Sequence, residues 1–176
     1  MNLSQFTHET VLRDGSSIHI RAIKPNDKQR LIDAFYRLTS ESRYFRFFGH
    51  KHKLSKEEAK YLTEIDFDHH VAIVATVQCD VEEEIVGVGR YHKHKKNSSE
   101  RFAEFSIAVN DEHQNRGVGT LLFKQLVTLA KKQSIFILEA DILLGNKGML
   151  KIIDRSGFKY ERITGYGLTH VIVKIE

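Results

Sequence analysis

Residues 103–125 read AEFSIAVNDEHQNRGVGTLLFKQ, and this stretch passes from a strand pattern through a polar loop into a helix pattern. Side chains from 103 to 109 alternate between two faces, as they do in a half-buried strand. The polar residues 110–119 end that strand and include two glycines. Leu122 and Leu126 then return at helical spacing. The stretch therefore predicts a strand–loop–helix unit.

The loop of this unit suits an anion. The first amides of a helix have no partner within the helix, and the helix dipole places partial positive charge there. Gly117 and Gly119 would let a ligand approach the backbone without meeting a Cβ atom, and Arg116 adds a positive charge. A pyrophosphate fits this chemistry. The alternative is an ordinary strand–turn–helix in which the glycines only serve the turn.

The composition indicates one ordinary globular domain spanning 1–176. The length of 176 residues is enough for a substantial core. The sequence contains no apolar run long enough for a bilayer and no signal-peptide pattern. Cys79 is the only cysteine, which favours a reducing cytoplasm. The net charge of +4 permits acidic partners, including the phosphates of a coenzyme.

The rest of the chain supplies further strands and helices around this unit. Pro25 is expected to open a helix that Ser40–Ser42 breaks, and Ser55 with Glu58 forms a capping box for the next helix. An Asp14-Gly15 pair predicts a hairpin turn. The expected strands cover 10–21 (two short runs), 71–78, 85–92, 103–109, 135–143, 158–163 and 168–175, and the last two expected helices cover 117–132 and 146–157. This order predicts an α+β sandwich around one mixed sheet.

The spacing Gln114-x-x-Gly117-x-Gly119, behind a strand that carries an acid, resembles the acetyl-CoA-binding signature of the GNAT superfamily of N-acetyltransferases. The order of elements is similar to that family over nearly the whole chain. The resemblance implies the GNAT fold, a mixed and mostly antiparallel sheet of about seven strands flanked by helices. Several runs look like the acetyltransferase domain of bacterial protein lysine acetyltransferases, namely 12–16, 20–25, 38–48 and 62–66 with 71–75. Residues 146, 149–150 and 157–158 also match that group's pattern.

That resemblance also assigns roles to residues of this chain. Glu104 stands where the family's general base is found, and Val109 is expected to exchange backbone hydrogen bonds with the pantetheine arm. The residues expected to contact acetyl-CoA, the cosubstrate, are Ile107, Ala108, Val109, Gln114, Asn115, Arg116, Gly117, Val118, Gly119, Thr120, Asn146 and Met149. For Asn146 a helix N-cap is the alternative, and the two roles are compatible.

The reaction needs a general base because the attacking amine must be neutral. A lysine amine has a pKa of about 10.4, so only about one molecule in 2,500 is neutral at pH 7 and able to attack a thioester. A carboxylate can take the proton, directly or through water. Glu139 and Glu64 are the reserve candidates for this role. Many GNAT enzymes carry a tyrosine that protonates the departing thiolate, but the matching position here is Ile153, so solvent or the amine's own proton would serve.

Three other clusters favour plain structural roles. Residues 66–70 hold two aspartates and two histidines, but a polar turn is favoured over a metal site, and no metal is expected. The basic run 92–96 is expected to be a solvated hairpin tip. The aromatic run 43–48 is expected to be core with its arginines reaching solvent, although it borders the acceptor cleft in this fold and so bears on specificity.

The function expected from the sequence is acetyl transfer from acetyl-CoA to an amine, in particular a protein lysine such as one on an acyl-CoA synthetase. The rivals are an acetyltransferase for a small amine and a non-catalytic module that senses acyl-CoA. A nucleic-acid binder would need a continuous basic stripe, which the sequence does not show. No membrane partner is expected, and the oligomeric state stays open.

Overall fold

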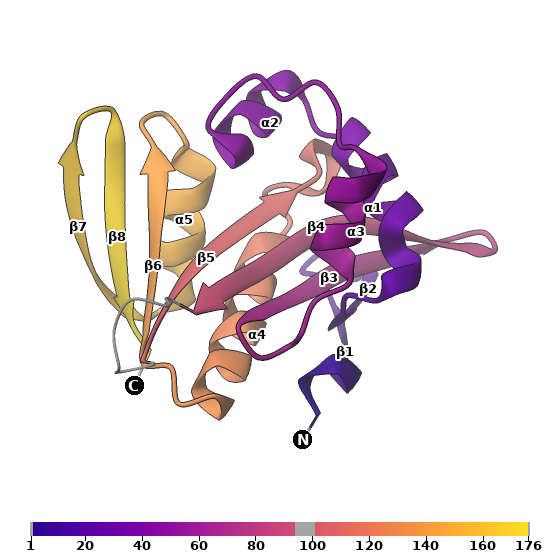
Figure 1. Ribbon diagram of the computed structural model, residues 1–176, viewed down its shortest axis with the longest axis horizontal. Helices are drawn as coiled ribbons and strands as arrows, with labels where there is room; N and C mark the ends of the chain where they lie inside the picture. The colour runs from indigo at the N-terminus through magenta and orange to yellow at the C-terminus, as the bar shows by residue number, and fades with distance from the viewer. Residues whose placement is uncertain (1, 94–100, 176) are drawn as a thin grey trace.

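The computed structural model describes residues 2–93 and 101–175, and its centre is an eight-stranded sheet in the order β1-β2-β3-β4-β5-β6-β8-β7 (Figure 1). The strands are β1 Thr7–Val11, β2 Ser17–Ala22, β3 His70–Cys79, β4 Glu82–Lys93, β5 Phe102–Val109, β6 Ile137–Leu143, β7 Lys159–Gly165 and β8 Leu168–Lys174. Only the β5–β6 pair is parallel. The α+β class is confirmed, and the sheet has one strand more than the about seven that the family resemblance implies.

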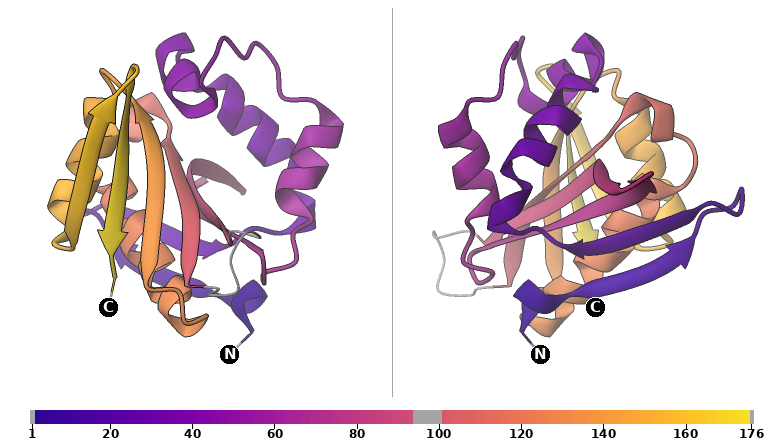
Figure 2. Two further views of the ribbon diagram at one scale, coloured as in Figure 1. Left: turned by 60° about the vertical axis from the view of Figure 1, so that its left-hand side comes forward. Right: turned by 90° about the vertical axis from the view of Figure 1, so that its right-hand side faces the viewer.

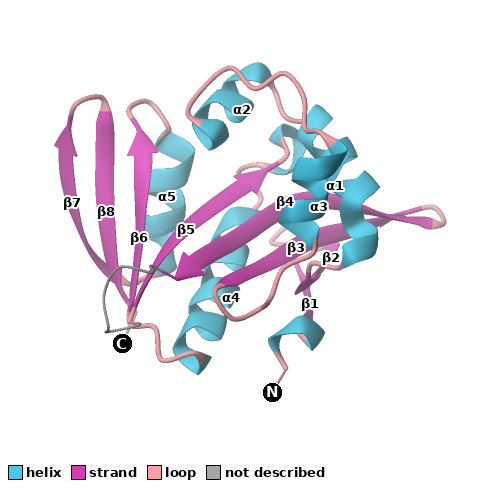
Figure 3. Cartoon of the chain, in the orientation of Figure 1, coloured by secondary structure: helices cyan, strands magenta, loops and turns pink. Residues whose placement is uncertain are grey.

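Helices cover both faces of the sheet (Figures 2 and 3). They are α1 Lys28–Tyr36, α2 Ser40–Phe47, α3 Lys56–Thr63, α4 Val118–Lys132 and α5 Lys147–Ser156, with short 3₁₀ turns at Leu3–Gln5, Pro25–Asp27 and Asp111–His113. None of the helices in the described part of the chain is long and apolar enough to cross a membrane.

The sequence of strand β3 is almost continuously apolar because both faces of the strand are covered. Val71, Ile73 and Ala75 belong to the core cluster that contains α4, whereas Ala72 and Val74 belong to the cluster formed by α1 and α3. Successive side chains of a strand point to opposite faces, so a strand that is covered on both sides needs apolar residues at every position.

Helix α2 corrects two expectations. Ser40 does not break a helix but begins one, because Thr39 is the N-cap and its side chain accepts a hydrogen bond from the Ser42 amide. No residue of α2 is buried, but Phe47 packs against the core cluster of α1 and α3, so the aromatic run 43–48 is core only in part. Figure 1 shows α2 standing above the sheet near the upper ends of β5 and β6.

Strands β5 and β6 pair at only one end. The parallel register joins Phe102 to Ile137, Ala103 to Leu138 and Glu104 to Glu139, and no pair follows (Figure 1). Strand β5 continues to Val109 while it pairs with β4 alone. From Phe105 onward, the edge of β5 that faces β6 therefore has no strand partner, and this divergence creates the site.

A buried arginine fastens β2 to the start of α1. The Arg21 side chain is 5% exposed and donates to Asp27 at 2.7 and 2.9 Å and to Glu83 at 2.6 and 3.0 Å. Hydrogen bonding to Arg21, with further help from Thr76, lowers the pKa of the Glu83 carboxyl to about 2. Arg21 is thus a buried cation with two carboxylates around it, as such a charge requires.

Candidate active site

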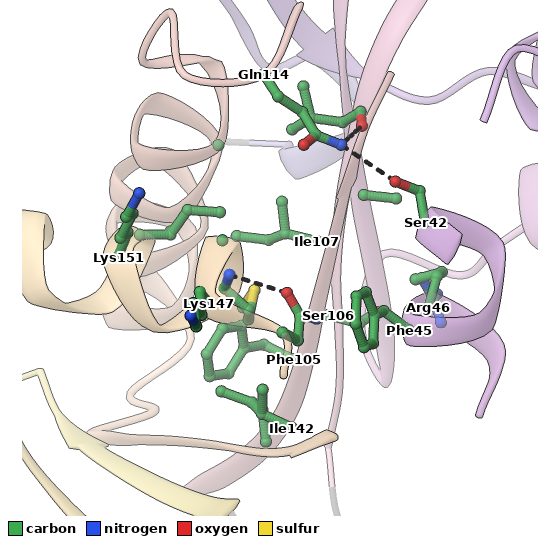
Figure 4. Close-up of a pocket in the computed structure, with 18 of the residues that line it drawn as sticks. Ser42, Phe45, Arg46, Phe105, Ser106, Ile107, Gln114, Ile142, Lys147 and Lys151 are labelled. Atoms are coloured by element: carbon green, nitrogen blue, oxygen red, sulfur yellow. Dashed lines mark hydrogen bonds between the residues drawn. The ribbon is translucent and has the colours of Figure 1, made fainter. Parts of the chain in front are cut away.

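A cleft of about 640 Å³ opens where β5 and β6 diverge. Its walls come from α2, β5, the loop before α4, β6 and α5, and this volume is typical of small-molecule sites. Figure 4 shows α2 bringing Ser42, Phe45 and Arg46 to one side and α5 bringing Lys147 and Lys151 to the other.

The predicted anion loop lies at one end of the cleft. Gly117, the N-cap of α4, has φ +98°, a left-handed conformation that favours glycine. Asn115 also has a positive φ, of 59°. The cleft is lined by Asn115, Gly117, Gly119 and Thr120, so these four predicted residues come together as expected.

Two predicted loop residues turn their side chains away from the cleft. The Arg116 guanidinium donates to Asp14 at 2.8 and 2.9 Å and to Ser16 at 2.9 Å, which ties the loop to the β1–β2 hairpin. Val118 is 1% exposed and packs in the core. Neither side chain lines the cleft, so only their backbone groups remain available for the predicted contact.

Gly119 has a packing role that the sequence did not reveal. A Cβ atom at this position would lie 2.5 Å from Cδ1 of Ile152, on α5. Any larger side chain at this position would require the Ile152 side chain to move, so Gly119 allows the present contact between α4 and α5.

Helix α5 contributes positively charged side chains to the cleft. Lys147, Lys151 and Arg155 all line the cleft, and their spacing of four residues places them on one face of the helix. Sequence reasoning missed them, although this spacing was visible. Asn146 caps α5 by accepting a hydrogen bond from the Met149 amide at 3.1 Å, and both residues also line the cleft.

Reversing one of these charges should weaken the binding of acetyl-CoA. We expect Lys151→Glu to raise the Kd roughly tenfold at low ionic strength and less at high salt, because surface charges are screened. Calorimetry at two salt concentrations measures this. Lys159→Glu, on exposed β7 outside the cleft, is the matched control. Equal Kd values for both variants and the wild type would exclude α5 from phosphate binding.

The middle of the cleft is the open edge of β5. Ile107, Ala108 and Val109 line it, as predicted. The side-chain amide of Gln114 donates to the Val109 carbonyl at 3.0 Å and to Ser42 Oγ at 3.3 Å (Figure 4). A carbonyl oxygen has two lone pairs, so Val109 can accept from Gln114 and from a ligand together.

Glu104 lies at the opposite end of the cleft from the loop. Its side chain is exposed and lines the cleft. Its neighbours across the sheet are His92 on β4 and Glu139 on β6. Of the reserve bases, Glu139 is half-buried and lies 3.7 Å from His170. Glu64 binds Lys28 at 2.5 Å at the end of α3, outside the cleft, and is thereby removed as a candidate.

His92 is a cleft residue that sequence reasoning placed wrongly at a solvated hairpin tip. Its ring stacks on His70 with centroids 3.9 Å apart. Burial lowers the pKa of the His92 imidazole, and the charges of Arg90 and Arg46 lower it further. A neutral imidazole therefore lies beside Glu104. Lys93 binds Asp68 at 2.7 Å, and positions 94–96 of that basic run lie outside the described residues.

The 66–70 segment is a polar turn. Asp66 accepts hydrogen bonds from the amides of Asp68 and His70, both at 2.9 Å. Across residues 2–93 and 101–175, no group of three or more His, Cys, Asp or Glu side chains could hold a metal ion.

Asp111 joins the segment after β5 to α2. Its carboxylate accepts from the amide and hydroxyl of Thr39 at 2.9 and 3.0 Å and from Ser42 Oγ at 2.8 Å. Asp111 therefore sits at the α2 N-terminus, where a negative charge is stabilising. The position of Phe45 and Arg46 in the cleft depends on this contact.

Removing this contact should loosen α2. We expect Asp111→Ala to speed amide hydrogen exchange in 42–47 at least about tenfold, the value of hydrogen bonds to a charged group. Hydrogen-exchange mass spectrometry measures it, with the neighbouring exposed Glu112→Ala as control. If exchange in α2 is the same in both variants, Asp111 does not hold the helix.

Known proteins share this architecture. Residues 32–158 match the model of the acetyltransferase (GNAT) family. The chain is 28% identical over 151 residues to the acetyltransferase Pat of Mycolicibacterium smegmatis, covering 86% of this chain and 44% of that protein. It is 27% identical over 151 residues to an acetyltransferase of Pseudomonas aeruginosa, covering 86% and 80%. The chain thus spans less than half of the first relative and most of the second.

Solved structures agree with these relatives. The GNAT domain of S. lividans PAT superposes with a TM-score of 0.87 at 27% identity, covering 96% of each chain. A putative acetyltransferase from Salmonella typhimurium, solved with its cofactor acetyl-CoA, has a TM-score of 0.69 at 13% identity, covering 90% of this chain and 94% of that one, and so shares the fold. The fold, the cleft and the family match lead to one conclusion: the chain belongs to the GNAT acetyltransferase family, whose members are N-acetyltransferases.

Proposed function

We propose that this acetyltransferase moves an acetyl group from acetyl-CoA to the side-chain amine of a protein lysine, with Glu104 as general base. The observation that carries the proposal is the divergence of β5 from β6. It leaves one cleft with a helix N-terminus at one end, three cationic side chains of α5 along one wall and an exposed carboxylate at the other end. A ligand with phosphates at one end and a reactive thioester at the other matches that order.

Different parts of the cleft bind different parts of acetyl-CoA. The α4 N-terminus with Lys147, Lys151 and Arg155 holds the phosphates, and the open edge of β5 offers backbone groups to the pantetheine arm. The thioester then lies along 105–108, between the loop and Glu104. A backbone amide of β5 polarises the thioester carbonyl. This arrangement fixes the reacting carbon beside the base.

The reaction is a direct transfer. The lone pair of the neutral amine attacks the thioester carbonyl carbon, so a C–N bond forms and the C–S bond breaks. Coenzyme A leaves as a thiolate with that electron pair, and the proton of the attacking nitrogen passes to Glu104. The thiolate is then protonated by solvent or by the proton that the amine released. Ile153 is fully buried and is no proton donor.

A protein acceptor is favoured over a small amine. Glu104 is exposed rather than enclosed, so a lysine on a large partner can reach it. Relatives named Pat support the same class. The resemblance in 12–16, 20–25, 38–48, 62–66 and 71–75 implies a lysine on an acyl-CoA synthetase as the acceptor. A single catalytic unit over 1–176 and a cytoplasmic location remain predictions.

Incubation with labelled acetyl-CoA tests the proposal. The acceptors are a lysate of the source cell, a purified acyl-CoA synthetase and a panel of small amines including polyamines. We expect label on protein lysines, located by mass spectrometry. Rapid turnover of small amines with unlabelled protein would favour the small-amine rival. Binding of acetyl-CoA without any turnover would favour the sensor.

A further inference from the structure

A second cavity, of about 50 Å³, adjoins the cleft beneath α1, α2 and α3. Four residues line both spaces, namely Leu38, Arg46, Phe47 and Ala108, so the cavity opens beside the middle of β5. One buried water needs at least about 10–15 Å³ on this measure, so the cavity has room for a small group of atoms. Its walls are mostly aliphatic and aromatic, except for two arginines and Asn110.

The two arginines, Arg46 and Arg90, set this cavity apart from ordinary core. Arg90 is 3% exposed, and its Nη1 donates to His70 Nε2 at 3.1 Å and to the Leu62 carbonyl at 3.5 Å. Burial and then Arg90 lower the pKa of the His70 imidazole to about 3, so His70 is a neutral acceptor. Within the described part of the chain, neither Arg90 nor Arg46 forms an ion pair with a carboxylate within 4 Å. Burial lowers the pKa of the Arg46 guanidinium, and the negative charge of Glu104, in the adjoining cleft, opposes that shift.

Arg21 shows what a buried arginine normally requires. It too is buried, and it has Asp27 and Glu83 around it at hydrogen-bonding distance. Arg90 has no carboxylate at hydrogen-bonding distance, and the nearby positive charge of Arg46 further disfavours its charged form. Burial, followed by that charge, lowers the pKa of the Arg90 guanidinium to about 9, which leaves it charged at pH 7. Two such groups at one cavity favour a carboxylate from outside the protein.

The cavity lies where the acyl group of the donor would end. Ala108 and Glu104 share one face of β5, and the thioester is placed between them under the proposed function. Across the sheet Val88 is paired with Ala108 and Arg90 with Ser106, so Arg90 is the diagonal neighbour of Ala108. Diagonal neighbours lie about 7–8 Å apart, a span that a short acyl chain and a guanidinium can bridge.

We propose that this cavity is an acyl pocket and that the enzyme also accepts the CoA thioester of a short dicarboxylic acid, of which the four-carbon succinyl group is the best match. The inference rests on the proposed function and extends its range of acyl donors. The distal carboxylate binds Arg90 and Arg46, and the two methylene groups lie against the apolar walls. The bonds made and broken are those of acetyl transfer, and the product lysine carries a negative charge in place of a positive one.

The test compares succinyl-CoA with butyryl-CoA, which has the same number of acyl carbons and a methyl group in place of the carboxylate. With one peptide acceptor, we expect kcat/KM for succinyl-CoA to exceed that for butyryl-CoA by at least about tenfold, the value of hydrogen bonds to a charged group. Calorimetry should show the same preference in Kd. Equal values for the two donors in both measurements would overturn the proposal.

Substitutions of the two cavity arginines test whether this cavity causes the preference for succinyl-CoA. Arg90→Met and Arg46→Met should each lower the succinyl-to-butyryl ratio of kcat/KM by about 10–100-fold, and the ratio cancels any general loss of activity. Arg37→Met removes an arginine that pairs with Glu84 at 2.8 Å outside both spaces, and its ratio should stay at the wild-type value. A ratio unchanged in both cavity variants contradicts the assignment. If Arg90→Met does not fold, Arg46→Met and the wild-type calorimetry decide.

Failure of this inference can be told apart from failure of the proposed function. Acetyl-CoA is included as a third donor in every assay. Transfer of acetyl with no preference for succinyl over butyryl rejects the pocket and keeps the acetyltransferase. If none of the three acyl groups reaches a lysine, the lysine-transfer function fails, and the calorimetric comparison still tests the pocket.

Discussion

Replacing Glu104 by glutamine should lower turnover at neutral pH by roughly 10²–10⁴, the usual value of a positioned base, with the affinity for acetyl-CoA nearly unchanged. Glutamine keeps the shape of the side chain and removes its charge. The carboxylate lies at the end of the cleft away from the phosphate loop, so the coenzyme should not sense the change. Steady-state kinetics with one peptide acceptor and calorimetry with acetyl-CoA measure the two quantities.

The pH dependence separates a base from a structural acid. As the pH rises toward the lysine pKa of about 10.4, solvent supplies the neutral amine and the defect of Glu104→Gln should shrink. Glu139→Gln is the control, because Glu139 is the register partner of Glu104 and lies outside the cleft lining. Parallel pH–rate profiles for wild type and Glu104→Gln would make Glu104 structural. The neutral imidazole of His92 would then be the leading candidate.

Gly117→Val should abolish measurable binding of acetyl-CoA while the protein stays folded. A β-branched residue rarely adopts φ +98°, so the loop must change its path at the first turn of α4, where we propose that the phosphates bind. Losing several hydrogen bonds to a charged ligand should raise the Kd by roughly 100-fold or more. Calorimetry gives the Kd, and circular dichroism and thermal unfolding report the fold.

Gly157→Val is the matched control for this variant. Gly157 has φ +83°, and a Cβ atom there meets nothing within 4 Å, which is also true of Gly117. Gly157 ends α5 and does not line the cleft, so the two variants share the backbone strain but not the site. Near-wild-type affinity in a folded Gly117→Val protein would show that this loop does not bind the coenzyme.

Local sequence patterns predicted most of the fold. The alternation of 103–109 and the helical spacing of Leu122 and Leu126 are set by neighbouring residues, and the strand, loop and helix appear where they indicated. The capping box of Ser55 and Glu58 is also present, with hydrogen bonds of 2.9 and 3.1 Å. These features depend on contacts that are close in the chain.

The errors concern contacts between residues far apart in the chain. Arg116 looked like a phosphate ligand, but Asp14, distant in sequence, binds it at 2.8 Å. The aromatic face of α2 looked like core, yet it borders a cleft, and composition cannot distinguish these two environments. His92 seemed part of a charged hairpin tip until its partner strand placed it beside Glu104.

The site was predicted in outline from the glycine spacing and the acid on the preceding strand. The basic face of α5 was visible as Lys147, Lys151 and Arg155 at four-residue intervals, but only the sheet topology brings that face to the loop. The arginine-lined cavity was not visible, because Arg46 and Arg90 meet only when α2 folds over β4.

The short contact between β5 and β6 has a consequence for control of the enzyme. Among the described residues, the backbone link between the first five strands and the remaining three consists of three residue pairs and the hydrogen bonds that the Phe136 and Ile137 amides donate to the Arg101 carbonyl. The contacts of a ligand between the diverging strands would depend on the angle between β5 and β6. If a partner bound to the outermost strand β7 and changed this angle, it would change the affinity for the coenzyme without contacting the cleft. Coenzyme binding would in turn alter the affinity for that partner by the same factor.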